Sequence, residues 1–575
     1  MPVHNSDIAD VLNEIADLLS LDEANQFRIR AYRNAARTIK GLSRPVSDLL
    51  ADGKDLSDYS GIGDDLAGKI ETVAQKGTLS QLKKLRKKFP SGLLKMLELD
   101  QLGPKTVKRL HDELGLKTLK QLRKAAEDGS VAELEGLGEK SQKQILNEIK
   151  RREESDETSR TRLDDAAEAA EPLREYLTNA EGTKEVVIAG SYRRRKETVG
   201  DLDIVATAKR DSAIMDRFVE YDDVEKVVSK GSTKSTVILR QGLQVDLRVV
   251  PQVAYGSALQ YFTGSKEHSV VLRKIARKKK LKLNEYGIFN KDDDRVAGRT
   301  EKAVYHKLGL QWIPPELREA QGEVEAARKE EVPDLVDLDD IRGDLQCHTT
   351  ASDGKDSLND MAGAAKNLGY DYLAITDHSK RVTVANGLDK RRLKRLIGRI
   401  DKLNGKMKGF RVLRSIEVDI LEDGSLDLPD EVLKELDLVV ASVHYHRNLS
   451  RKKQTERILK GLDNKYVSIL AHPTGRMIGD REPMDINLEK IMDHAKDVGC
   501  YLEINAQPDR LDLADNYVRM ARDKGLKLAI STDAHATHEL GFMNYGVGQA
   551  RRGWMEKKDI LNTRTWKQLK KLLSR

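Results

Sequence analysis

The chain has 575 residues, 39% of them hydrophobic and 34% charged, and its formal net charge is +7. This length is too great for one hydrophobic core and predicts roughly three to five domains. No apolar run reaches the roughly 18 residues of a membrane-spanning helix, and the N-terminal residues lack signal-peptide features, so we expect neither a membrane partner nor export. The two cysteines, Cys347 and Cys500, exclude a disulfide framework and a cysteine-based zinc finger.

Residues 1–150 are rich in helix formers, with apolar residues at helical spacing and short glycine turns. Three segments here resemble one another: YSGIGDDLAGKI (59–70), LDQLGPKTVKRL (99–110) and LEGLGEKSQKQIL (134–146). A glycine turn that opens a helix exposes backbone N–H groups to a phosphate, so the segments predict helix–hairpin–helix contacts with DNA of any sequence. Gly61, Gly63 and Gly103 are the candidates, although a glycine between two helices is usually only a turn.

From residue 185 the pattern changes to strands with two-residue alternation, in EVVIAGS, DLDIVATA, STVILRQ and LQVDLRVV. Asp201 and Asp203 fall on one face of the second strand, and Asp246 falls on the polar face of the fourth. If these strands pair, three carboxylates converge, and two divalent cations about 3.5–4 Å apart would relieve their repulsion. A lone Asp-x-Asp beside glycine often marks only a turn or an exposed strand. Here a Gly-Ser turn and three arginines precede it, which favours nucleotidyl transfer.

The acidic segment GEVEAARKEEVPDLVDLDD (322–340) contains Pro333 and is expected to be an interdomain linker. Beyond it, helices alternate with the short apolar strands YLAIT, DLVVAS, SILAH, YLEIN and LKLAIST, which predicts a parallel α/β fold resembling a barrel. Eight of the twelve histidines follow residue 343, most of them where a strand ends. Ligands at the C-terminal ends of barrel strands point into one pocket, and imidazole with carboxylate suits Zn²⁺, Mn²⁺ or Fe²⁺. Any single histidine could instead cap a strand or satisfy a core hydrogen bond.

The motifs of the first 320 residues resemble those of family X DNA polymerases, the DNA polymerase beta relatives. GSYRR with GDLDI, followed by VDLR, is similar to the nucleotidyltransferase signature of that family. The resemblance continues through FRIRAYRNAARTI (27–39), YFTGS (261–265), LNEYGIF (283–289) and LGLQWIPPELRE (308–319). It implies a DNA-directed DNA polymerase that fills short gaps during DNA repair.

The resemblance also implies roles for individual residues. Asp201, Asp203 and Asp246 would hold two Mg²⁺ ions, for which Mn²⁺ can substitute, and Arg248 would orient Asp246. The nucleotide would be contacted by Ser191, Arg194 and Gly200 at its triphosphate and by Tyr261, Phe262 and Gly264 at its sugar, while Arg273 would reach the template minor groove. Lys266 and Ser269 stand where the animal enzyme carries Asp and Asn near the nascent base pair, which puts fidelity in question.

A second activity implied by the resemblance is removal of a 5′-deoxyribose phosphate through a lysine Schiff base. The matching lysine is Lys69, with Tyr32 of AYRNAA as its helper. The reaction needs a neutral amine, which burial or a neighbouring cation can provide. A second lysine usual in that pocket is replaced by Asp65, which weakens the expectation of lyase activity.

Residues 340–575 resemble the PHP (polymerase and histidinol phosphatase) family. The resemblance implies up to three Zn²⁺ or Mn²⁺ ions and a ligand set consisting of Gln346, His348, Asp353, His378, Glu417, His444, His472, Asp533 and His535. Members usually open with His-x-His, and Gln346 takes the first position here, where an amide oxygen binds a borderline metal less well. Such a domain implies 3′→5′ exonuclease, 3′-phosphatase and abasic-site endonuclease activity.

The expected fold is therefore multidomain: a helical helix–hairpin–helix N-terminal region, an α+β nucleotidyltransferase palm, and a C-terminal α/β distorted barrel. The expected boundaries are 1–90, a helical DNA-binding or lyase domain; 91–150, a fingers-like subdomain; 151–260, the palm; 261–321, a thumb-like nucleotide-selection subdomain; 322–340, the linker; and 341–575, the PHP domain. The expected partners are dNTPs and gapped or primer–template DNA with a 5′-phosphate, bound by a cytoplasmic monomer. A template-independent transferase and a DNA-end-binding scaffold with decayed sites stay open as alternatives.

Overall fold

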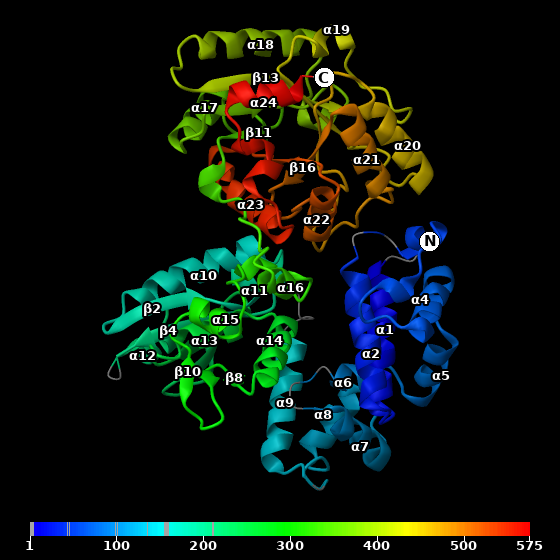
Figure 1. Ribbon diagram of the computed structural model, residues 1–575, viewed down its shortest axis with the longest axis vertical. Coiled ribbons are helices and arrows are strands. Elements are labelled where there is room, and N and C mark those ends of the chain that lie inside the picture. Colours follow the sequence, from blue (N-terminus) through cyan, green and yellow to red (C-terminus); the bar gives the residue numbers. More distant parts are fainter. Residues whose placement is uncertain are drawn as a thin grey trace. The chain divides into compact units, whose positions relative to one another are not determined.

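The computed structural model describes residues 5–574 apart from 43, 45, 98, 100, 101, 135, 155–159, 210 and 211. It divides into two compact units, Met1–Ser159 and Arg160–Arg575, each of which is described by itself (Figure 1). None of the helices described combines the length and apolar composition needed to cross a membrane.

The first unit is helical. Its helices are α1 (Asn5–Leu21), α2 (Gln26–Lys40), α3 (Val46–Ala51), α4 (Asp64–Lys76), α5 (Ser80–Lys88), α6 (Gly92–Leu97), α7 (Pro104–Leu114), α8 (Leu119–Glu127) and α9 (Glu139–Glu154). Gly61 has φ +87°, a conformation that favours glycine, and Gly63 is the N-cap of α4. Gly103 caps α7, whose first residue is Pro104, and Gly136, with φ +79°, precedes α9. The expected glycine turns therefore do connect helices.

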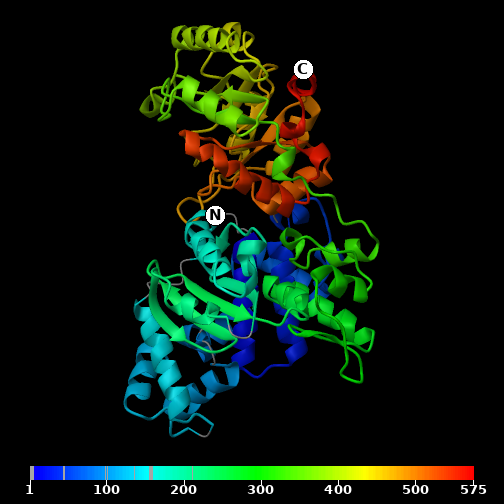
Figure 2. The ribbon, with the colours of Figure 1, turned by 90° about the vertical axis from the view of Figure 1, so that its left-hand side faces the viewer.

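The second unit begins with a five-stranded sheet. Its elements are β1 (Thr161–Arg162), α10 (Leu163–Thr178), β2 (Thr183–Ile188), α11 (Gly190–Arg193), β3 (Thr198–Val199), β4 (Leu202–Ala208), α12 (Ile214–Val219), β5 (Val224–Ser229), β6 (Lys234–Leu239) and β7 (Gln244–Val249). The strand order is β2-β4-β7-β6-β5, and only the β4–β7 pair is parallel. The sheet is seen as blue-green arrows in Figure 2. The sequence did not predict the edge strand β5, because its side chains are almost all exposed and show no apolar alternation.

A smaller subdomain follows the sheet. It contains α13 (Tyr255–Thr263), α14 (Lys266–Lys278), α15 (Glu301–Lys307) and the three-stranded sheet of β8 (Lys282–Asn284), β9 (Gly287–Phe289) and β10 (Arg295–Ala297). The YFTGS motif ends α13 at Gly264, with φ +69°, and Ser265 caps α14 by accepting a hydrogen bond from the His268 N–H.

Part of the segment expected to be a linker is a helix of this subdomain. Residues Glu323–Arg328 form α16, and Val324 and Ala327 pack in the same core as Leu272. The Glu323 carboxylate is fully buried and lies 2.6 Å from Nδ1 of His268. The acidic composition concealed this helix because Glu323 is paired inside the protein rather than solvated.

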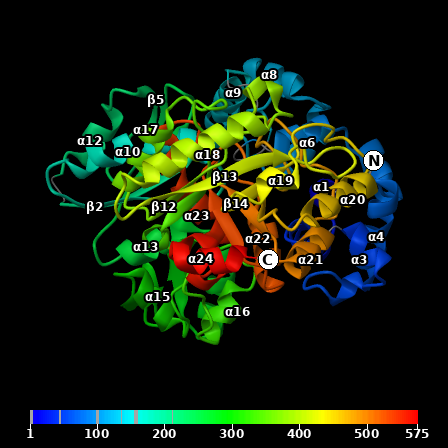
Figure 3. The same cartoon turned by 90° about the horizontal axis from the view of Figure 1, so that it is seen from above.

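Residues 343–575 form a parallel barrel. Its strands follow chain order: β11 (Gly343–Cys347), β12 (Tyr372–Ile375), β13 (Arg411–Asp419), β14 (Leu438–Ser442), β15 (Ile469–Leu470), β16 (Tyr501–Asn505) and β17 (Leu528–Ser531). A parallel bridge between Cys347 and Ala534 brings the last strand back to the first. Its helices are α17 (Leu358–Asn367), α18 (Lys390–Asn404), α19 (Asp430–Leu433), α20 (Arg451–Leu462), α21 (Leu488–Val498), α22 (Asp515–Asp523), α23 (Met543–Arg552) and α24 (Trp566–Leu573). Figure 3 shows α18 lying along β13. The expected α/β barrel is confirmed.

Candidate active sites

The two aspartate-bearing strands lie side by side in the five-stranded sheet. Strand β4 pairs with β7, and Asp203 lies directly opposite Asp246. Asp201 immediately precedes β4, and Leu202 and Ile204 are fully buried in the core. The predicted strand pairing is confirmed, and it places the three carboxylates in one neighbourhood.

These aspartates disfavour one another's ionisation. Burial, together with the charges of Asp201 and Asp246, raises the pKa of Asp203 to about 7. Burial and the charge of Asp246 also raise the pKa of Asp201. Lys234 Nζ lies 2.9 Å from one carboxylate oxygen of Asp246, and Thr236 donates a 2.7 Å hydrogen bond to the other. Across the described ranges, the tight clusters of metal-ligating groups are all in the barrel. Because Lys234 is paired with Asp246, a cation at this sheet must compete with Lys234 for that carboxylate.

A cavity of about 400 Å³ lies beside these strands. It is lined by Asp201 and Asp203, and by all the residues expected to contact the nucleotide: Ser191, Arg194, Gly200, Tyr261, Phe262, Gly264 and Arg273. Lys266 and Ser269 also line it, as does Arg160, which the sequence did not indicate. Arg248 Nη2 lies 3.6 Å from Asp246 Oδ2 and its guanidinium stacks over Phe262 at 4.3 Å. Residues of the motifs GSYRR, GDLDI and YFTGS, together with Arg273, therefore surround one space.

Glycine is required at the entrance to this cavity. Gly190 has φ +62°, and a Cβ at this position would lie 3.2 Å from Asp203 Oδ2. A larger residue would therefore be strained and would crowd the carboxylate.

The three consecutive arginines after the Gly-Ser turn have three different partners. Arg193 forms a bidentate ion pair with Glu301, with both distances 2.8 Å. Arg194 donates to the Thr263 carbonyl oxygen at 2.6 Å, and Arg195 donates to Asn544 Oδ1 at 3.0 Å. Of the three, Arg194 is the one that lines the cavity.

In the barrel, the Glu417 carboxylate lies among four histidines. His378 Nδ1 and His472 Nε2 are each 3.1 Å from a carboxylate oxygen, and the distances for His444 Nε2 and His348 Nε2 are 3.4 and 3.6 Å. Burial acts to raise the pKa of Glu417, but His378 and His444 hold it well below its usual value.

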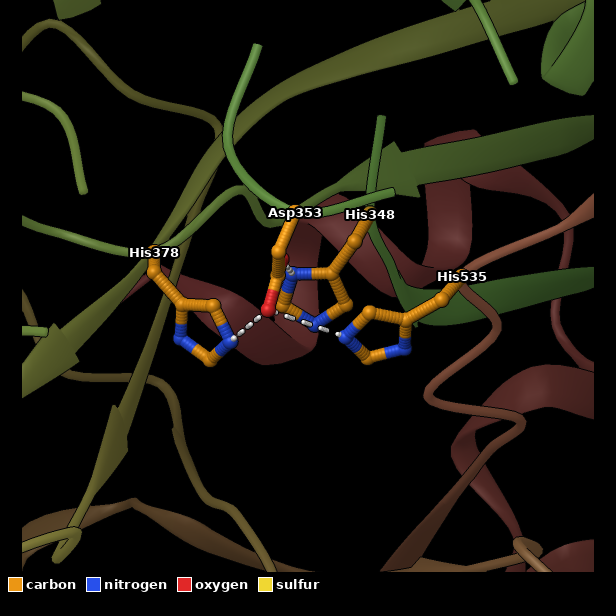
Figure 4. Close-up of side chains that lie close together, drawn as sticks. All are labelled: His348, Asp353, His378 and His535. Atoms are coloured by element: carbon orange, nitrogen blue, oxygen red, sulfur yellow. Dashed lines mark ion pairs between the residues drawn. The ribbon is translucent and has the colours of Figure 1, made fainter. Parts of the chain in front are cut away.

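A second carboxylate, Asp353, lies between histidines from three segments (Figure 4). It lies 3.4 Å from His378 Nε2 and 3.5 Å from His535 Nε2, and His348 Nδ1 is 3.8 Å away. Seven of the nine expected ligands fall into three overlapping groups, which are His348, Asp353, His378 and His535; His378, Glu417 and His444; and His348, Glu417 and Asp533.

The donor set fits metal ions. Gln346 Oε1, His348 Nδ1 and Glu417 Oε2 are buried and make no hydrogen bond within the described structure. Buried polar atoms are normally satisfied, so these spare lone pairs are available to cations. The groups contain imidazole and carboxylate and no thiolate, which suits Zn²⁺ or Mn²⁺.

Successive segments of the sequence match families of known proteins. Family models match for a helix-hairpin-helix domain (residues 3–79), a SAM-like helix-hairpin-helix tandem (93–151), the DNA polymerase beta palm (162–257), the DNA polymerase beta thumb (258–319) and the PHP domain (344–507). A DNA polymerase/3′-5′ exonuclease PolX of Bacillus subtilis (strain 168) is 37% identical, and the match covers the whole of both chains. The chain belongs to the family X DNA polymerases with a C-terminal PHP domain.

Other relatives match a part of the chain. Probable phosphatases of Thermoanaerobacter sp. (strain X514) and Caldanaerobacter subterraneus subsp. tengcongensis are 29% and 26% identical over 38% of this chain. The matches cover 89% and 86% of those proteins.

Buried threonine–aspartate pairs lie close in the chain to three of the expected metal ligands of this family X polymerase. The backbone N–H and hydroxyl of one threonine donate to the two oxygens of one aspartate in each of three pairs: Thr349 with Asp377, Thr474 with Asp512, and Thr532 with Asp344. Thr349 and Thr532 adjoin His348 and Asp533 in the chain, and Thr474 lies two residues after His472. His472 and Asp533 have φ of +27° and +53°, uncommon values that the pairs help to maintain. The pairs were not predicted from the sequence, where the one signal was a threonine one or two residues from each expected ligand.

Gln346 lies beside another ligand. Its amide nitrogen is 3.4 Å from Asp533 Oδ1, and its side chain is fully buried. Gln346 therefore lies among the expected metal ligands, and its amide oxygen, which has no hydrogen bond in the described structure, is available to a cation.

Lys69 and Tyr32 of the polymerase lie together, as the lyase expectation requires. Lys69 Nζ is 5.4 Å from the centre of the Tyr32 ring and 2.5 Å from Asp65 Oδ2. Burial acts to lower the pKa of Lys69, but hydrogen bonds to Asp65 and Tyr32 outweigh it and raise the pKa. The amine is therefore held in its charged form, which opposes Schiff-base formation. Lyase activity stays a prediction.

Proposed function

We propose that this family X polymerase fills short gaps in DNA by template-directed synthesis and that its PHP domain hydrolyses phosphate esters at DNA 3′ ends. The observation that carries the proposal is the register of β4 against β7, which sets Asp203 opposite Asp246 beside the cavity that holds Ser191 and Arg194. Two carboxylate-bearing strands beside an anion-binding cavity suit the joining of a nucleoside triphosphate to a hydroxyl group.

In the palm, Asp201, Asp203 and Asp246 would hold two Mg²⁺ or Mn²⁺ ions, which when bound activate the primer hydroxyl and neutralise the triphosphate. Arg194 would pair with the triphosphate, because it is the arginine of its triplet that faces the cavity. Tyr261 and Phe262 pack edge to face and would form the wall against the sugar. Lys266 and Ser269 line the same cavity and would influence nucleotide selection.

In the PHP domain, up to three Zn²⁺ or Mn²⁺ ions would be held by the nine expected ligands and would supply hydroxide at neutral pH. Glu417 would bridge two positions, because it belongs to two of the three ligand groups. Asp419 would keep the His444 ring oriented, since its Oδ1 lies 3.2 Å from His444 Nδ1 and also accepts a 3.1 Å hydrogen bond from the His444 backbone N–H. The substrate would be the 3′ end of a DNA strand.

DNA would be bound independently of its sequence. The turns at Gly61, Gly63 and Gly103 each open a helix and would present backbone N–H groups to phosphates. A gapped duplex with a 5′-phosphate is the proposed form. The monomeric state and the cytoplasmic location stay predictions.

Extension of a one-nucleotide-gapped duplex bearing a 5′-phosphate tests the proposal, run with Mg²⁺ and with Mn²⁺. We expect one added nucleotide, complementary to the template, and its loss in Asp203→Ala. Hydrolysis of the 3′ end should survive in Asp203→Ala and disappear in His472→Ala. Equal extension without a template would support a transferase instead, and inactivity of the wild type in both assays would support a scaffold.

A further inference from the structure

Helix α23 of the PHP domain has two buried faces. Met543, Val547 and Ala550 pack in the core of the barrel. Other residues of the helix contact the polymerase part of the same compact unit: Asn544, Tyr545, Gly548, Arg551 and Arg552. Their positions repeat at three- and four-residue spacing, so they form one stripe along the helix. The helix thus joins the barrel to the palm and the thumb-like subdomain.

Arg552 reaches the segment that carries Arg194 and Arg195, here called the nucleotide-binding loop. Its Nη1 donates to the Arg194 carbonyl oxygen at 2.8 Å and to Glu319 Oε1 at 3.1 Å. Its Nε donates at 3.0 Å to Asp515, a barrel residue on α22. The Arg552 side chain is only 4% exposed, so these contacts are made away from water.

Glu319 is shared between two arginines. Its Oε1 accepts a hydrogen bond from Arg194 Nε at 3.1 Å, the same distance as from Arg552 Nη1. Burial acts to raise the pKa of Glu319, but Arg552 and Arg194 lower it, so the carboxylate is charged. Any phosphate that binds Arg194 must compete with this carboxylate for the guanidinium.

The neighbouring residues of the loop also rest on α23. Arg195 donates to Asn544, and a Cβ at Gly548 would lie 3.0 Å from Arg195 Cδ. Arg195, which follows Arg194, has φ +55°, an uncommon backbone conformation for a residue other than glycine. This unusual turn lies against α23. Gly548 and Arg552 lie one turn apart on α23. Gly548 leaves space for the Arg195 side chain, and Arg552 contacts the Arg194 backbone.

We propose that Arg552 of the PHP domain is a positioning residue for nucleotide binding in the polymerase site. It fixes the backbone of Arg194, and it shares the charge of Glu319 so that the Arg194 guanidinium can turn to a triphosphate. The polymerase pocket is therefore completed by the C-terminal domain. This inference rests on the proposed polymerase function and assigns no role to the PHP metal ligands.

Steady-state extension of a gapped duplex, with dNTP concentration varied, tests the inference in the full-length protein. Arg552→Ala should raise KM for the dNTP about tenfold or more, because charge-assisted hydrogen bonds are lost, and should change kcat less than about threefold. Arg551→Ala is the matched control. Arg551 pairs with Glu316 at 2.8 Å at the same interface. Within the described structure its side chain also contacts Val336 and Asp337, which lie far in the chain from Arg194 and Arg195. Its KM should stay within about twofold of the wild-type value.

Two further variants separate positioning from loosening of the interface. Arg552→Lys keeps a charge but cannot make all three contacts, so an intermediate KM is expected. Glu319→Gln placed in the Arg552→Ala background removes the competing charge and should lower KM again. Hydrolysis of a 3′ end, measured on each sample, should stay at the wild-type rate and reports that the PHP domain is folded.

An unchanged KM in Arg552→Ala would overturn the inference, and so would an equal rise in Arg551→Ala. Failure of the proposed function looks different, because wild-type protein would then extend no primer. If Arg552→Ala does not fold, an Arg552→Lys variant with wild-type KM overturns the inference in its place.

Discussion

Replacement of Glu417 by glutamine should remove more metal from the PHP site than replacement of any other single carboxylate in it. Glu417 belongs to two of the three ligand groups, whereas Asp353 and Asp533 each belong to one. Its oxygens lie 3.1–3.6 Å from four histidine nitrogens, so the amide of glutamine would remove a charge that these positions share. Loss of a residue that merely supports a ligand costs roughly 10–100-fold in metal affinity. Loss of Glu417 should therefore cost at least about 1.4–2.8 kcal/mol at each of two positions.

The assay is metal content by mass spectrometry after dialysis against a fixed free Zn²⁺ or Mn²⁺ concentration, together with 3′-end hydrolysis. We expect Glu417→Gln to lose two metal ions and its hydrolysis, and Asp353→Asn to lose one. Glu422→Gln is the control, since Glu422 lies near the same strand end but its side chain is 41% exposed and pairs with Arg381. Gap filling by each sample reports folding of the rest of the chain. If Glu417→Gln retained as much metal as Asp353→Asn, Glu417 would not contribute to two metal positions.

Three further perturbations follow from the same geometry. Because the pKa of Asp203 is raised to about 7, its ionised fraction falls about tenfold between pH 8 and pH 6, so the Mg²⁺ concentration for half-maximal extension should rise about tenfold; a pH-independent value would contradict this. Gln346→His should tighten Zn²⁺ binding at least about tenfold in a competition titration, and an unchanged affinity would remove Gln346 from the ligand set. Glu301→Gln leaves the fully buried Arg318 without its ion pair, so urea unfolding followed by tryptophan fluorescence should show a loss of about 3–5 kcal/mol; a loss below about 1 kcal/mol would show that the pair is dispensable.

The sequence predicted those features that depend on local periodicity. Asp203 and Asp246 could be placed on facing positions because side chains alternate along a strand, and the barrel ligands could be placed together because each follows an apolar strand. Both predictions needed only the residues near each motif. The strand pairing and the clustering of the histidines are confirmed.

Features that depend on distant partners could not be predicted. Arg193, Arg194 and Arg195 are adjacent in the chain, yet their partners lie 108, 69 and 349 residues away. Nothing in three consecutive arginines indicates which of them faces the nucleotide. The same holds for Glu323, which is acidic and near a proline, yet is buried against His268.

Lys234 is the feature of the palm that most affects the proposed chemistry. It lies on β6, directly beside the strand that carries Asp246, and its ammonium occupies the side of that carboxylate where a cation would bind. The apolar residues of β6 predict a strand, but they do not predict that β6 pairs with β7 and so brings Lys234 to Asp246. A cation that binds here must displace Lys234 from Asp246.

Anomalous scattering from a crystal soaked with Mn²⁺ and a non-hydrolysable dNTP analogue would show whether the palm binds two metal ions. We expect two peaks about 3.5–4 Å apart, contacting Asp201, Asp203 and Asp246, with Lys234 displaced from the Asp246 carboxylate. A palm without Mn²⁺, with Lys234 still bound to Asp246 while the PHP ligands are loaded, would contradict the account.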